Sequence, residues 1–111
     1  MTTKEVIDIL GLKPLSQFEH REISGVFISD MLSDVMAGAK SGNLWVTVQT
    51  HKSIVPAANL VDVAAVIIPN GKSVPPETIE LANRHNIALL ATDTMTFDLV
   101  GKLYSLGLVA K

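Results

Sequence analysis

HREISGVFISDMLSDVMAGAKSGNLWVTVQTH, residues 20–51, is the stretch of the sequence that decides the fold. An apolar run over 23–28 ends at a polar pair, and a segment whose apolar residues have helical spacing follows it. After Gly42, a second extended run covers 44–49. This switch of hydrophobic period predicts a strand, a crossover helix and a parallel strand, which together form a βαβ unit.

The remainder of the chain repeats the same alternation of strands and helices. Short apolar runs over 63–68 and 87–90 predict two further strands, and the first is rich in Val and Ile, as expected of a central strand. Helices are expected where a capping residue or a proline precedes an apolar stripe: after Thr2, after Ser53, at Pro75-Pro76-Glu77 and after Thr94. We therefore predict an α/β fold over residues 1–111 as one domain, a three-layer α/β/α sandwich with a mostly parallel sheet of about four to five strands.

Three finer predictions concern helix caps and buried faces. We expect Ser29 or Asp30 to cap the helix after the first strand, whose buried stripe would be Leu32, Val35, Met36 and Ala39. The strand over 44–49 places Trp45 beside polar residues on one face, which indicates a position near a sheet edge or at a subunit contact. The last helix is expected to bury a stripe made of Phe97, Val100, Leu103 and Tyr104.

Composition excludes several classes of function. The net charge is -2 and the basic residues are scattered, which argues against nucleic acid and anionic membranes as partners. No apolar run approaches the ~18 residues of a membrane span, and the first ten residues do not form a signal peptide. The chain has no cysteine, so it has no disulfide and no thiolate for an iron–sulfur cluster. We expect a cytoplasmic protein without a cofactor.

Polar side chains follow every strand of the predicted sheet. In an open parallel sheet, ligands bind outside the carboxyl ends of the strands. The candidate ligand-binding residues there are Asp30, Thr50, His51, Asn70, Thr92 and Asp93. Two helix N-termini, near Asp30 and Thr94, would favour a phosphate or a carboxylate. The alternative is that these residues only cap helices, because Ser, Thr, Asp and Asn are the usual capping residues.

His51 is the candidate that capping does not explain, and it would add a hydrogen-bond donor at the same edge. The three histidines have no short spacing, and Asp30 with Asp34 lacks a third ligand, so no metal site is expected. The chain contains neither a GxSxG motif nor a P-loop, and no catalytic residue is predicted.

The opening stretch resembles the DRTGG domain family, named for a motif that runs along the first strand. The motif aligns with His20, Arg21, Ser24, Gly25 and Val26. Arg21 and Gly25 match, and Ser24 keeps the hydroxyl of the family threonine, whereas His20 replaces the aspartate and Val26 replaces the second glycine. The resemblance continues to His51 and is to the small stand-alone, hydrogenase-associated members. The iron–sulfur label of such relatives cannot describe cluster ligation here, because the cysteine ligands are absent.

The resemblance implies a non-catalytic regulatory or ligand-sensing domain. The polar strand ends and helix N-termini indicate that it binds a nucleotide or a small anion at the carboxyl ends of the strands. The alternative is a protein-interaction adaptor for a partner enzyme, such as a hydrogenase-related one, with no small ligand. A third alternative is a small enzyme that uses Asp30 or Asp93 as a general base. We also expect a homodimer, because 48% apolar and 18% charged residues leave apolar surface to cover and related regulatory domains pack in pairs.

Overall fold

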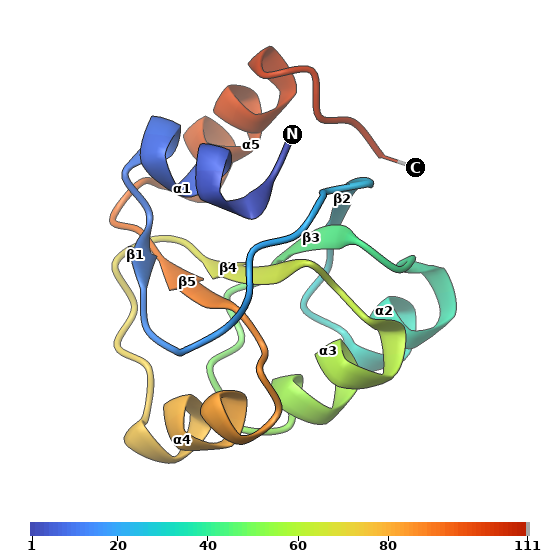
Figure 1. Ribbon diagram of the computed structural model, residues 1–111, viewed down its shortest axis with the longest axis vertical. Helices are drawn as coiled ribbons and strands as arrows, with labels where there is room; N and C mark the ends of the chain where they lie inside the picture. The colour runs from blue at the N-terminus through green and yellow to red at the C-terminus, as the bar shows by residue number, and fades with distance from the viewer. Residues whose placement is uncertain (111) are drawn as a thin grey trace.

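The computed structural model describes residues 1–110 and contains a five-stranded sheet between two layers of helices (Figure 1). The sheet order is β1-β5-β4-β3-β2, and every neighbouring pair is parallel except β1 with β5. The strands are β1 (Lys13–Pro14), β2 (Gly25–Ile28), β3 (Asn43–Val46), β4 (Ala65–Ile68) and β5 (Leu89–Ala91). The predicted α/β/α fold with a mostly parallel sheet is confirmed.

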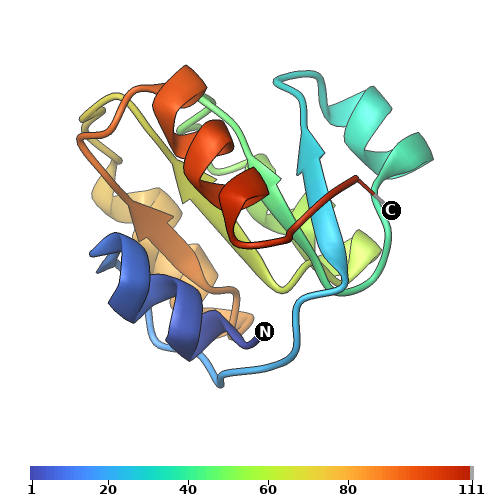
Figure 2. The ribbon, with the colours of Figure 1, turned by 90° about the horizontal axis from the view of Figure 1, so that it is seen from above.

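Helices cover both faces of the sheet. Helices α1 (Thr3–Leu10) and α5 (Thr96–Ser105) lie on one face, and α2 (Leu32–Gly38), α3 (Ile54–Val61) and α4 (Pro76–Arg84) lie on the other (Figures 1 and 2). None of the helices within residues 1–110 has the length and apolar character needed to span a bilayer.

Local sequence signals explain where helices begin and end. The Thr2 side chain accepts a hydrogen bond from the Glu5 backbone N–H at 3.2 Å, and the Glu5 carboxylate accepts one from the Thr2 N–H at 3.0 Å. This capping box starts α1. Gly11 ends the helix at a φ of 63°, a left-handed conformation that favours glycine. Helix α4 begins with Pro76 at its first position, where the missing N–H costs no hydrogen bond.

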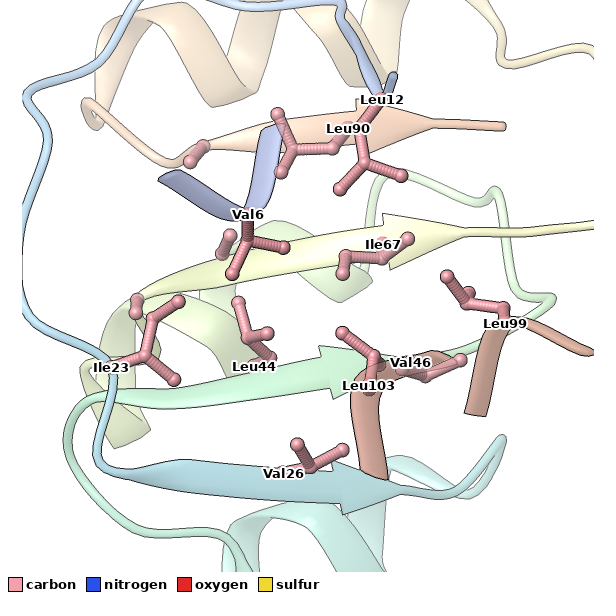
Figure 3. Close-up of a cluster of buried hydrophobic side chains, with 13 residues drawn as sticks. Val6, Leu12, Ile23, Val26, Leu44, Val46, Ile67, Leu90, Leu99 and Leu103 are labelled. Atoms are coloured by element: carbon pink, nitrogen blue, oxygen red, sulfur yellow. The ribbon is translucent and has the colours of Figure 1, made fainter. Parts of the chain in front are cut away.

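The core on the first face joins α1 and α5 to the middle of the sheet. Val6 of α1 and Leu99 and Leu103 of α5 pack on strand side chains that include Leu44 and Ile67 (Figure 3). The predicted stripe of α5 was therefore wrong in part. Leu103 is buried as predicted, but Phe97 is 87% exposed and Tyr104 is 70% exposed. The side of α5 that faces the sheet carries Leu99 and Leu103, an i,i+4 pair. The predicted stripe included Leu103 but not Leu99.

The prediction for β3 was right about a position near a sheet edge and wrong about the face that carries Trp45, which is buried. The strand is second from the edge of the sheet, and Trp45 is 0% exposed in the core formed with α2 and α3. Its indole N–H donates to the Ser29 carbonyl at 2.8 Å, so burial leaves no unpaired donor. Thr47, the polar neighbour on the predicted face, is also buried, with its hydroxyl bonded to Asp30. The face of β3 that carries Trp45 and Thr47 belongs to the core, although its polar residues are typical of an exposed face in the sequence.

The start of α2 also differs from the prediction. Met31 occupies the N-cap position without a side-chain hydrogen bond, so neither Ser29 nor Asp30 caps the helix in that sense. Of the expected stripe, Val35 is buried, whereas Met36 is 49% exposed. Leu32 and Ala39, the other two residues of the stripe, are partly buried against the same core as Val35.

Strand β1 was not predicted. It contains only Lys13 and Pro14, paired antiparallel with Ala91 and Leu90. The next residue, Leu15, donates its N–H to the Leu89 carbonyl at 2.8 Å. Two residues are too few to show a hydrophobic period, and proline is tolerated there because the strand lies at the sheet edge.

Candidate ligand-binding site

The structure places the six predicted site residues at the carboxyl edge of the sheet but distributes them among different environments. Asp30 lines a small hollow of about 70 Å³ beside Thr47 and Thr96. Thr92 and Asp93 line a larger hollow of about 480 Å³. Thr50, His51 and Asn70 line neither of these two hollows. The predicted set therefore does not form one cluster.

Asp30 joins the ends of β2 and β3. Its carboxylate accepts hydrogen bonds from the Thr47 hydroxyl and from the Val48 N–H, both at 2.9 Å. Its own carbonyl accepts a hydrogen bond from the Gln49 side chain at 3.2 Å. These contacts account for the carboxylate, and the small hollow beside it has room for water rather than for a nucleotide.

His51 and Asn70 organise the turns in which they lie. A ring nitrogen of His51 accepts a hydrogen bond from the Ser53 N–H at 3.1 Å, just before α3. The side-chain amide oxygen of Asn70 accepts a hydrogen bond from the Thr96 N–H at 2.9 Å, which joins the loop after β4 to the first turn of α5. The Thr50 carbonyl accepts a hydrogen bond from a hydroxyl of α4 at 2.8 Å. These groups are engaged within and between the loops, but none of α2, α3, α4 and α5 has a side-chain hydrogen bond at its N-cap residue, so they are not helix caps in the sense predicted.

The larger hollow, called the β1–β5 hollow below, lies at the sheet edge where the carboxyl end of β5 meets β1. Its walls come from the end of α1, from β1, and from the loops that follow β4 and β5. The register pairs Lys13 with Ala91, the last residue of β5, which brings Lys13 next to Thr92 and Asp93. Figure 2 shows the two loops side by side at one end of the molecule.

Hydrogen bonds tie these two loops together. The Asn70 N–H donates to the Thr94 carbonyl and the Gly71 N–H to the Thr92 carbonyl, each at 3.0 Å. Gly71 has a φ of 64°, and a Cβ atom there would lie 3.1 Å from an oxygen of the Asp93 carboxylate. The left-handed conformation therefore favours glycine, and a side chain there would require the Asp93 carboxylate to shift. The floor of the hollow is held in place before any ligand arrives.

Sequence reasoning missed the two lysines of the β1–β5 hollow. Lys13 lies on β1, and Lys72 lies in the loop after β4. Lys13 gave no signal because β1 itself was not predicted. Lys72 follows Asn70-Gly71 directly after the central strand, and that place in the sequence could have identified it.

The DRTGG-like residues lie at the other end of the sheet, where the strands begin. The Arg21 guanidinium donates two hydrogen bonds to the Asp62 carboxylate, at 2.7 and 3.1 Å. Together with a hydrogen bond from the Ser41 hydroxyl, this contact lowers the pKa of Asp62 from 3.8 to about 2. The Ser24 hydroxyl donates to the Ser41 carbonyl at 2.8 Å, and Gly25 is buried in β2. We call this group the amino-end network.

The amino-end network joins neighbouring segments of the chain at the beginning of the strands. It connects the segment before β2 with the loop between α3 and β4, and Gly42 and Asn43 at the start of β3 complete it. The Asn43 side chain donates to the Ser24 hydroxyl at 3.1 Å. None of these residues lines the β1–β5 hollow. Arg21, the charged residue of the motif that the sequence retains, is thus engaged in an ion pair with Asp62.

Together, the fold and the hollow define an open, mostly parallel α/β protein with a ligand-sized hollow at the carboxyl ends of its strands. No family model matches the chain, and no curated protein matches it. Among solved structures, it is similar to the regulatory region of Clostridium perfringens pyrophosphatase, which comprises CBS and DRTGG domains and was solved with its activator, diadenosine tetraphosphate. The TM-score is 0.70 and the sequence identity 18%, over 97% of this chain and 47% of that one.

This similarity shows the fold and agrees at that level with the DRTGG resemblance of the sequence. The chain spans about half the length of the solved regulatory region. The stand-alone, hydrogenase-associated type stays a prediction.

Proposed function

We propose that the protein is a regulatory, ligand-sensing domain that binds a nucleotide or a small anion at the carboxyl ends of its strands. The observation that carries the proposal is the similarity of 97% of the chain to a regulatory region solved with a nucleotide activator. The β1–β5 hollow supports it, because its volume of about 480 Å³ lies within the usual range of ligand sites.

A binding role suits the lining of the hollow better than catalysis does. The charged groups are two lysines and Asp93, and none of the three histidines takes part. For Asp93 to act as a general base, the substrate would have to place the proton that is removed within hydrogen-bond distance of its carboxylate. Turnover that Asp93→Asn abolishes would favour the enzyme alternative and would overturn the regulatory proposal.

The test is a thermal-shift screen with adenine and guanine nucleotides. At ten times its Kd, a ligand stabilises the folded state by about 1.4 kcal/mol, which raises the Tm of a domain of this size by about 5 °C. We expect such a shift for at least one nucleotide. His51→Ala is the matched control, because His51 lies outside the β1–β5 hollow, and we expect it to leave the shift unchanged. The absence of any shift at millimolar nucleotide would favour the adaptor alternative.

We also propose a homodimer, formed through an apolar groove beside β2, the edge strand that the tail after α5 covers only in part. The groove, of about 460 Å³, lies between β2, α5 and the tail after α5, and it includes Ile28, Tyr104 and Val109. Its lining contains no charged side chain. Two identical surfaces bring like charges together, so an uncharged lining favours a second copy over a charged partner.

The geometry of β2 supports strand pairing at this edge. The Val26 N–H points outward and is already paired, because it donates to the Val109 carbonyl of the tail at 3.0 Å. By the alternation of a strand, the N–H of Ile28 points to the same side. Light scattering of the parent protein should give the dimer mass, and Ile28→Lys should give the monomer mass. A monomeric parent across a hundredfold dilution series would contradict the homodimer and favour a partner enzyme as the occupant.

A further inference from the structure

Two lysines reach the β1–β5 hollow from segments that are far apart in the chain. Lys13 comes from β1 and Lys72 from the loop after β4. Within residues 1–110, neither lysine forms an ion pair, so both ammonium groups keep their donors for another partner. The backbone N–H groups of Lys72 and Ser73 also have no backbone acceptor in this range. The polar side of the hollow therefore offers donors to an anion.

The other side of the hollow is apolar. It consists of side chains that are each half-buried and so keep part of their surface open to the hollow: Leu10, Leu15, Val74 and Ile79. Covering such a surface with an apolar group is favourable, because water is released from both. A ligand that fills the hollow needs an apolar or aromatic part as well as an anionic one.

Asp93 adds a third requirement. Its carboxylate accepts no hydrogen bond among residues 1–110, unlike those of Asp30 and Asp62. An ionised carboxylate only accepts hydrogen bonds, so its natural ligand partners are hydroxyl or amino groups. It also repels an anion, which directs the anionic group of a ligand toward Lys13 and Lys72.

We propose that the β1–β5 hollow binds a small phosphorylated ligand with an aromatic body and hydroxyl groups, which is the chemistry of a nucleoside monophosphate. The phosphate lies between Lys13 and Lys72, the aromatic body covers the apolar side, and Asp93 accepts hydrogen bonds from the hydroxyls. This assignment rests on the proposed ligand-sensing function and adds to it the class of ligand and the residues that recognise it.

The size and charge of the hollow favour one phosphate over a longer chain. The lining carries two positive charges against one negative charge, which suits a single phosphate group. A further phosphate would have to lie closer to Asp93 or outside the hollow. Free phosphate would leave the apolar side uncovered, and an uncharged nucleoside would leave both lysines without a partner.

The experiment is a titration of the full chain, labelled with ¹⁵N, with AMP, adenosine and inorganic phosphate, followed by the amide signals in NMR spectra. We expect AMP to shift the amides of residues 71–74 and 92–94 and to bind at least about tenfold more tightly than adenosine or phosphate. Lys13→Gln and Lys72→Gln should each weaken AMP binding by about tenfold and leave adenosine unaffected. Lys52→Gln is the matched control, since this lysine lies in the loop before α3 and outside the hollow.

The outcomes separate this inference from the function on which it rests. AMP binding that the double variant Lys13→Gln/Lys72→Gln leaves unchanged, or shifts confined to Asp30, Thr47 and Thr96, would overturn the assignment and keep the ligand-sensing function. Phosphate that binds as tightly as AMP would overturn the role of the apolar side. A domain that responds to no nucleotide in either assay would contradict both proposals. The spectra of the free variants show whether each one is folded.

Discussion

The amino-end network and the β1–β5 hollow lie at opposite ends of the sheet and differ in how their charged side chains are paired. In the amino-end network, Arg21 and Asp62 satisfy each other, and the hydroxyls around them are bonded. In the β1–β5 hollow, Lys13, Lys72 and Asp93 have no ion-pair partner within residues 1–110. Paired groups hold segments of the chain together, whereas unpaired groups around a hollow remain available to a ligand. The residues that carry the family resemblance therefore belong to the structural end.

The largest effect that tests this contrast is expected at Gly42, in the amino-end network. Its φ is 84°, and a Cβ atom there would lie 2.9 Å from the Ser24 hydroxyl oxygen, which hydrogen bonds hold in place. We expect Gly42→Ala to lower the free energy of unfolding by about 3 kcal/mol, since strain and a steric clash add. Gly11→Ala is the control. Gly11 has a φ of 63° with nothing within 4 Å of its added Cβ, so a loss of about 1 kcal/mol is expected. Equal losses in urea unfolding would contradict a tightly packed network.

Gly71 provides the corresponding change at the β1–β5 hollow. Its added Cβ atom would meet only the end of the flexible Asp93 side chain, at 3.1 Å, so the carboxylate can move away. We expect Gly71→Ala to cost about 1.5 kcal/mol, less than Gly42→Ala. It should, however, weaken nucleotide binding, which Gly42→Ala should leave unchanged while the protein is folded. Calorimetric titration of both variants decides this. A loss of binding in the Gly42 variant would show that the two ends are coupled.

Arg21→Gln removes the ion pair and should cost about 1 kcal/mol at pH 7, because both side chains are more than one-third exposed. The pKa of Asp62 is lowered to about 2 in the folded state, from 3.8. A lowered pKa means that the stabilisation is present above pH 4 and is lost as the pH falls toward 2. The difference between parent and variant should therefore shrink over this range. A difference that stays constant from pH 7 to pH 2.5 would exclude Asp62 as its source.

The smallest effect on stability is expected for the lysines of the hollow. Lys13→Gln and Lys72→Gln remove exposed charges that make no ion pair within residues 1–110, so each should change the free energy of unfolding by less than about 0.5 kcal/mol. Urea unfolding without ligand measures this. A loss above about 1 kcal/mol in either variant would place that lysine among the structural residues and remove the contrast between the two ends.

The sequence by itself determined the positions of most helices and strands. The capping box of Thr2 and Glu5, the proline at the start of α4 and the apolar run that contains β4 are local signals, and each has the predicted result. Such signals act through backbone hydrogen bonds and burial within a few residues, so they can be read without knowing the fold. They also placed polar residues at the carboxyl ends of the strands, as a parallel sheet requires.

Only the tertiary structure decided which of those polar residues are free. Asp30 and Asn70 are engaged by groups that the fold brings to them, and His51 by Ser53 in its own turn. Lys13 and Lys72, in contrast, line one hollow because β1 pairs with β5. The same holds for burial, since the face of β3 that carries Trp45 and Thr47 is part of the core, and its donors are satisfied by the loop that follows β2. Hydrogen bonds and contacts between distant segments produce no hydrophobic periodicity in the sequence. They can therefore be identified only once the sheet is assembled.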